Sequence, residues 1–156
     1  MKIFALRLKP EQDLKAQLES FVKLNQIKAG FVITCVGSLE KATLRMVNEN
    51  ILKEFKADFE IISLVGTLSQ DGMHLHMSLS DKDGNVIGDH VKEGCVVRTT
   101  AEIVIGEADE LTFTRNFDEK TEFKELEIRK EIDHSLFGSV KEKIPFTRDK
   151  KVRDFQ

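Results

Sequence analysis

The sequence lacks tryptophan and tyrosine, and it has only two cysteines and two prolines among its 156 residues. Phenylalanine, present eleven times, is the only aromatic residue, so we expect an aliphatic core with phenylalanine. Cys35 and Cys95 both lie in apolar stretches, as buried thiols of a reducing cytoplasm usually do. The composition therefore gives no support to a disulfide framework, and we expect a cytoplasmic protein.

Long apolar runs and an excess of positive charge are also missing. No segment approaches the ~20 apolar residues of a membrane-spanning helix, and the apolar run that follows Lys2 is too short for a signal peptide. Lys and Arg number 24 against 27 Asp and Glu, so the net charge of -3 does not favour a phosphate backbone. We expect no membrane contact and at most weak or indirect DNA binding.

The length suits one domain, which we place at residues 1–140, followed by a charged tail at residues 141–156. Pro10 precedes a segment in which apolar residues share one stripe, which predicts one amphipathic helix. Beyond it, β-branched and aromatic runs alternate with turn residues. This pattern predicts an α+β fold with a mostly antiparallel β-sheet of seven to nine strands and one main amphipathic helix packed on it.

Three of the four histidines lie in one stretch, "MHLHMSLSDKDGNVIGDH", from Met73 to His90. Its Asp-Gly pair is a strong hairpin signal, and apolar residues alternate with polar ones on both sides. For Leu79 to meet Ile87 on the core face, the numbers of paired residues must sum to 166, which also pairs Leu75 with Val91.

The same register pairs His76 with His90 and places His74 one pleat away on the same face. Three imidazoles that leave a fourth position open are a typical zinc site, although nickel, cobalt or copper would also be accepted. The alternative is a polar sheet face whose histidines only form hydrogen bonds. We expect a site for zinc or another divalent transition metal.

Other residues near this hairpin in the sequence are weaker candidates. Glu93 and Glu102 could hydrogen-bond an imidazole or act as a base for metal-bound water, although a glutamate is by default a solvated surface residue. Cys95 could be a reactive thiol, whereas a buried, inert thiol is the commoner case. Arg98 lies within an apolar strand, which is typical of a subunit contact.

The segment "HLHMSLSDKDGNVIGDHVKEGCVVRTTAEIVI" resembles the signature region of the plant and prokaryote conserved (PPC) domain. "ITCVGSLEKATLR" and "FEIISLVGTLS" resemble the two segments that usually precede it, and the resemblance extends from Met1 to about Phe117. It implies a homotrimer of an antiparallel sheet with a helix against it. In prokaryotic members it also implies a metal held by His74, His76 and His90.

Two features of the plant members are changed or missing. Their AT-hook, a short Arg-Gly-Arg motif, does not occur in this sequence. The segment that resembles the plant partner-contact motif is "ADFEII", in which Phe59 and Glu60 keep the pattern whereas Ala57 and Asp58 replace Gly-Arg. Asp89 stands where relatives commonly carry glycine, and the predicted register places it opposite Met77.

Two functions follow from this pattern. One is a trimeric metal-binding module with a DNA-binding or regulatory role, and the other is a small metal-dependent hydrolase or lyase that uses metal-activated water. The sequence favours the non-enzymatic function because it contains no recognisable nucleophile–base pair or carboxylate dyad. A small-molecule ligand is compatible with both, and a carboxylate in a pocket beside the metal would favour the enzyme.

Overall fold

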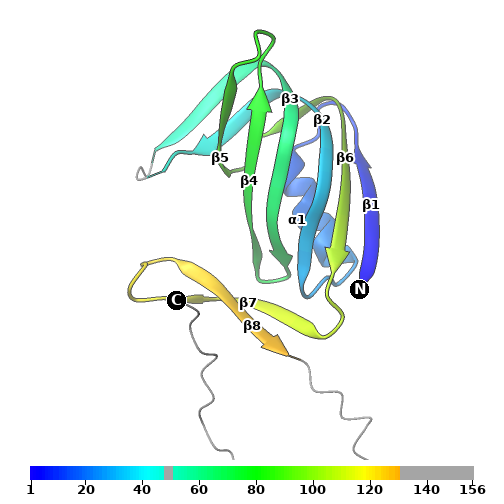
Figure 1. The fold of residues 1–156 in the computed structure, drawn as a ribbon, viewed down its shortest axis with the longest axis vertical. Coiled ribbons are helices and arrows are strands. Elements are labelled where there is room, and N and C mark those ends of the chain that lie inside the picture. Colours follow the sequence, from blue (N-terminus) through cyan, green and yellow to red (C-terminus); the bar gives the residue numbers. More distant parts are fainter. Residues whose placement is uncertain (48–50, 131–156) are drawn as a thin grey trace, which may run out of the picture.

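The structure, a computed structural model, describes residues 1–47 and 51–130. These residues form one helix and eight strands (Figure 1), which confirms the predicted α+β class. The predicted boundary between domain and tail, and the fourth histidine, His134, lie outside the described residues. The elements are β1 (Lys2–Leu8), α1 (Leu14–Leu24), β2 (Gly30–Arg45), β3 (Leu52–Ser69), β4 (Gly72–Ser80), β5 (Val86–Val91), β6 (Val96–Glu107), β7 (Leu111–Phe117) and β8 (Lys124–Lys130).

Helix α1 begins at Leu14 and not directly after Pro10, where the sequence pattern suggested. The reason is local, because Glu11 adopts a φ of 68° that a right-handed helix does not allow. Asp13 then caps the helix by accepting a hydrogen bond of 2.9 Å from the backbone N–H of Ala16. The apolar stripe of the helix packs against the sheet as predicted, with Leu14, Leu18 and Val22 buried.

Six antiparallel strands form the main sheet in the order β1-β6-β2-β3-β4-β5, and α1 lies behind it in the view of Figure 1. The far end of β2 turns away from β6 and pairs with β5, which makes Leu44 the partner of Val91 and Arg45 the partner of His90. Strands β2, β3, β4 and β5 therefore close on one another at this end. The buried side chains of this unit are aliphatic and include Leu44, Leu75, Leu79 and Val91.

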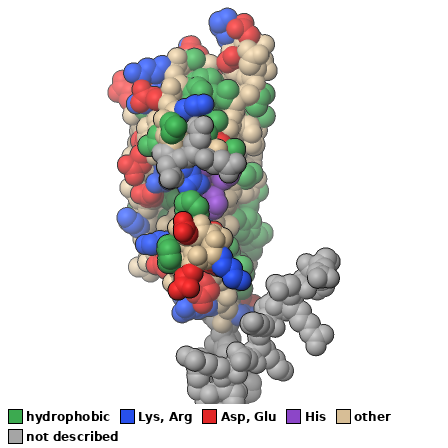
Figure 2. All heavy atoms as spheres, turned by 90° about the vertical axis from the view of Figure 1, so that its left-hand side faces the viewer, with side chains coloured by type: hydrophobic (Ala, Val, Ile, Leu, Met, Phe, Trp, Pro, Cys, Tyr) green, Lys and Arg blue, Asp and Glu red, His purple; other side chains and the backbone are tan. Residues whose placement is uncertain are grey.

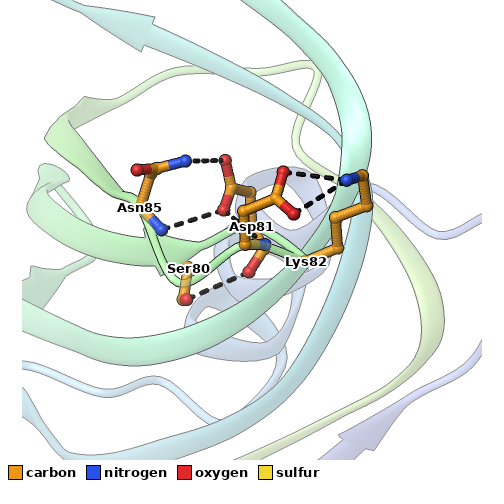
Figure 3. Close-up of polar contacts among 5 residues, drawn as sticks. Ser80, Asp81, Lys82 and Asn85 are labelled. Atoms are coloured by element: carbon orange, nitrogen blue, oxygen red, sulfur yellow. Dashed lines mark hydrogen bonds and ion pairs between the residues drawn. The ribbon is translucent and has the colours of Figure 1, made fainter.

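The turn between β4 and β5 is held by the side chain of Asp81 (Figure 3). Its carboxylate accepts hydrogen bonds from the backbone N–H of Asp83 and of Asn85, both at 2.9 Å, and from Nδ2 of Asn85 at 3.0 Å. Gly84 adopts a φ of 82°, which glycine tolerates without strain. This turn sets the register of the two strands that carry the histidines.

Strands β7 and β8 form a separate two-stranded sheet that lies across the lower end of the main sheet in Figure 1. Hydrogen bonds attach it there, among them one from the backbone and one from a side chain. The backbone N–H of Phe113 donates to the carbonyl of Lys28 at 3.0 Å, and Nη2 of Arg115 donates to Oγ1 of Thr67 at 2.8 Å. Within the described part of the chain, no helix has the length and apolar character to cross a membrane.

Candidate metal centre

The β4–β5 pairing has the register that the apolar pattern predicted. His76 is the partner of His90, and Leu79 is the partner of Ile87. Leu75 and Leu79 are buried on the core side, whereas His74 and His76 are exposed and His90 is half-buried. The burial of alternate apolar residues therefore forces the three imidazoles onto the opposite face of the sheet.

The three rings form a nearly equilateral triangle. Their centroids are separated by 5.0 Å (His74 to His76), 4.9 Å (His74 to His90) and 5.4 Å (His76 to His90). One nitrogen from each ring lies within 4.8 Å of the other two, and the Nε2 atoms of His74 and His76 are 3.0 Å apart. Tetrahedral bonds of about 2.0–2.1 Å place two ligand nitrogens about 3.4 Å apart, so small rotations of the rings suffice.

The backbone beneath the histidines requires glycine at one position. Gly66 of β3 pairs with Leu75 and adopts a φ of 149°. A Cβ atom there would collide with the carbonyl oxygen of His74. Only glycine therefore lets β3 approach β4 closely enough to pair beside this imidazole.

The surroundings keep two of the imidazoles neutral. Burial, followed by the charges of Lys92 and Arg45, lowers the pKa of His90 from 6.5 to about 4. Partial burial, the neighbouring His76 and the charge of Arg115 lower the pKa of His74. Because a metal binds the unprotonated ring, both shifts favour metal ligation at neutral pH.

One ring nitrogen of this group lacks a hydrogen-bond partner within the described ranges, which a bound metal ion could replace. Nδ1 of His90 is buried and has no hydrogen-bond partner among the described residues. An unpaired buried polar atom costs about 1–3 kcal/mol, which a metal ligated at Nδ1 would offset. The donor set consists of imidazoles alone, which suits zinc and similar transition metals better than calcium or magnesium.

The other candidate residues are not part of this group of ligands. The carboxylate of Glu93 is exposed and lies 3.7 Å from Nζ of Lys15. Cys95 is buried, its thiol donates to the carbonyl of Thr43, and burial raises its pKa to about 11, as for an inert thiol. Glu102 lies on β6, where its neighbours are Arg7 and Val36, so the structure does not bring it to the histidines.

The residues expected at partner or subunit contacts are also placed. Arg98 is exposed, and its Nε lies 2.8 Å from a carboxylate oxygen of Asp58 in the same chain. Phe59 is buried in the core with 6% of its surface exposed, so only Glu60 of that pair presents its side chain to the surface. Asp89 is the partner of Met77 as predicted, and its carboxylate accepts a 2.7 Å hydrogen bond from the backbone N–H of Val47.

Two cations beside the histidines were missed by the sequence reasoning. Arg45 comes from the far end of β2, and Arg115 comes from β7. Both are far from the histidine hairpin in the sequence; Arg45 ends the segment "ITCVGSLEKATLR", and Arg115 belongs to none of the quoted segments. Only the pairing of β2 with β5 and the position of the β7–β8 sheet bring them to the site.

The chain is similar in sequence and structure to several known proteins. The bifunctional protein GlmU of Synechococcus sp. (strain JA-3-3Ab) is 42% identical over 130 residues, which are 83% of this chain and 21% of GlmU. The chain thus spans about a fifth of the length of that relative. A hypothetical protein of known structure from Salmonella enterica is 41% identical with a TM-score of 0.82, over 84% of this chain and 95% of that protein.

A metal-containing protein of known structure from Archaeoglobus fulgidus is 30% identical with a TM-score of 0.68, over 81% of this chain and 93% of that protein. The sequence pattern of the Plants and Prokaryotes Conserved (PCC) domain, the family whose resemblance was noted above as PPC, matches residues 1–109. This match includes the main sheet, the helix and all three histidines of the hairpin. The chain therefore belongs to the Plants and Prokaryotes Conserved domain family.

Proposed function

We propose that this protein binds a divalent transition metal, with zinc as the first choice, through His74, His76 and His90. The observation that carries the proposal is the convergence of one nitrogen from each of these rings within 4.8 Å. The lowered pKa values of His74 and His90 support it because they keep those rings unprotonated. The Archaeoglobus relative, which is described as metal-containing, supports it as well.

The chain contributes a preformed set of ligands. His76 and His90 are held opposite each other by the β4–β5 ladder, and His74 is held one pleat away. A metal with three imidazole ligands keeps a position for water or another ligand and can act there as a Lewis acid. The group of candidate ligands in the described residues contains no fourth side chain, so water or another ligand would complete the coordination of a bound metal.

The test of this proposal is the metal content of the protein itself. Protein purified without chelators, then dialysed against zinc at low micromolar concentration, is analysed by elemental mass spectrometry. We expect about one zinc per chain, and less than a tenth of that in a variant in which all three histidines are replaced by alanine. Equal zinc content in the two proteins would leave the histidines as a polar sheet face only.

We further propose that the chain assembles as a homotrimer. Adjacent strands β2 and β3 carry large apolar side chains that are about half exposed, namely Ile33 (47%), Val36 (55%), Ile62 (58%) and Val65 (55%). Contact with another copy would remove this apolar surface from water. The number of copies, three, follows from the family resemblance.

A metal-dependent hydrolase or lyase is the second candidate function. The observation that favours it is the donor set, since three neutral imidazoles without a carboxylate leave the metal its full positive charge for polarising a ligand. Hydrolysis of 4-nitrophenyl acetate that depends on zinc and is lost in His90→Ala would support this activity. Direct binding to DNA, in contrast, has no support from the net charge of -3.

A further inference from the structure

Three cations from different parts of the fold surround the histidine group. Arg45 of β2 is the direct partner of His90. Arg115 of β7 donates a hydrogen bond to Thr67, and Thr67 is the partner of His74 between β3 and β4. The third cation, Lys92, follows β5. In Figure 2, histidine side chains reach the surface with Lys or Arg side chains close beside them.

These cations form no ion pair among the described residues, although the charge of Glu125 acts on Arg115. Among residues 1–47 and 51–130, the ion pairs include none that involves Arg45, Lys92 or Arg115. The acidic residue whose charge reaches His74 is Glu125, and its effect on the pKa of His74 is smaller than the opposite effect of Arg115. The surface around the histidines is therefore positively charged even before a metal binds.

Arg115 retains unused hydrogen-bonding capacity. Its Nη2 donates to Thr67 at 2.8 Å and its Nη1 donates weakly to the carbonyl of Lys124 at 3.4 Å. Its Nε is buried and has no hydrogen-bond partner in the described part of the chain. A half-buried guanidinium is usually paired with a carboxylate or phosphate, because its fork of donors matches their oxygens.

The hairpin that carries Arg115 reaches the other arginine as well. Phe123, at the turn between β7 and β8, lies beneath the guanidinium of Arg45, with 5.3 Å between Cζ and the ring centroid. The β7–β8 sheet therefore contacts the surroundings of His74 through Arg115 and those of His90 through Arg45. This sheet lies beyond residues 1–109, which match the family pattern.

We propose that Arg115 and Arg45 form an anion-binding subsite beside the metal centre, which takes the carboxylate or phosphate group of a small molecule. The proposal rests on the proposed metal site, because a divalent metal held by three neutral imidazoles adds two further positive charges at the same place. An anion that contacts both the metal and Arg115 would balance this charge and would give the guanidinium an anionic partner.

The test measures metal binding and anion binding separately. Wild-type protein, Arg115→Gln and Arg129→Gln are loaded with Co²⁺, and the visible absorption of the bound metal is followed while inorganic phosphate or acetate is added. Glutamine at position 115 removes the positive charge and keeps a polar side chain. Arg129 is a matched control, since it lies on β8 of the same sheet and pairs with Glu127.

We expect all three proteins to bind Co²⁺ with affinities within about threefold of one another, because Arg115 is not a metal ligand. Arg115→Gln should bind phosphate about tenfold more weakly than wild type, the loss expected for one charge-assisted contact, and Arg129→Gln should match wild type. If Arg115→Gln weakens the binding of phosphate and not that of acetate, the subsite takes phosphate groups. If the substitution weakens the binding of both anions, the subsite takes carboxylates as well.

Each contrary result identifies what fails. If Co²⁺ binds but Arg115→Gln takes up both anions as well as wild type does, or wild type takes up neither, the subsite is refuted and the metal site stands. If wild-type protein does not bind Co²⁺, the proposed metal function fails and the anion subsite beside it fails too.

Discussion

Replacing His90 by alanine tests the metal site at its most enclosed ligand. The half-buried His90 is the member of the group whose Nδ1 has no partner, and it alone joins β5 to the two histidines of β4. Structural zinc sites contribute about 10–16 kcal/mol over about four ligands, so one imidazole accounts for about 3 kcal/mol. We therefore expect zinc affinity to fall about 100-fold in His90→Ala.

The fold should survive this change. The apolar side chains that hold the hairpin, Leu75, Leu79 and Val91, lie on the opposite face of the sheet and are not altered. Far-UV circular dichroism of metal-free His90→Ala should therefore match that of the wild type. The variant also removes an unpaired buried nitrogen, so we expect no large loss of stability in the absence of metal.

The assay is a zinc titration by calorimetry, with a competing chelator where binding is tight. Ser78→Ala is the matched control, because Ser78 lies on β4 two residues after His76 and its loss leaves all three imidazoles in place. We expect this control to bind zinc as the wild type does. Equal zinc affinity in His90→Ala and the wild type would refute the metal site.

Four further outcomes are expected. Because the pKa of His90 is about 4 in the folded protein and 6.5 without its surroundings, the unfolded chain gains its proton first as pH falls. The melting temperature of the metal-free protein should therefore fall between about pH 6.5 and pH 4, and it should fall less in His90→Gln. The same dependence of the melting temperature on pH in both proteins would contradict this. Leu75→Ala should cost about 2–5 kcal/mol in urea unfolding, since Leu75 is 1% exposed, and a loss below about 1 kcal/mol would mean that this face is not core. Light scattering should give about 53 kDa, three times the 17.8 kDa of one chain, with a shift toward the monomer in Val36→Lys; a wild-type monomer at micromolar concentration would rule out the trimer. Binding to a labelled DNA duplex, followed by fluorescence anisotropy, should disappear between low and physiological salt, whereas sequence-specific binding that persists would show that net charge is a poor guide here.

The local sequence pattern was sufficient to predict how the three histidines come together. Alternation of apolar and polar residues on either side of one Asp-Gly turn predicted that His76 is the partner of His90, and the structure has this pairing. The prediction succeeded because a hairpin is a local element, in which one turn and one buried face leave a single register. The start of α1 was less predictable, since the backbone of Glu11 delays it to Leu14.

The sequence by itself determined the α+β class and the face of the hairpin on which the histidines lie, because both depend on the spacing of apolar residues within short segments. Only the tertiary structure decided what surrounds those histidines. Arg45 reaches His90 because β2 bends from β6 to β5, and Arg115 reaches Thr67, 48 positions earlier in the chain, because the β7–β8 sheet lies across the end of the main sheet. Contacts between distant segments depend on the packing of whole sheets, and no local spacing of residues encodes them.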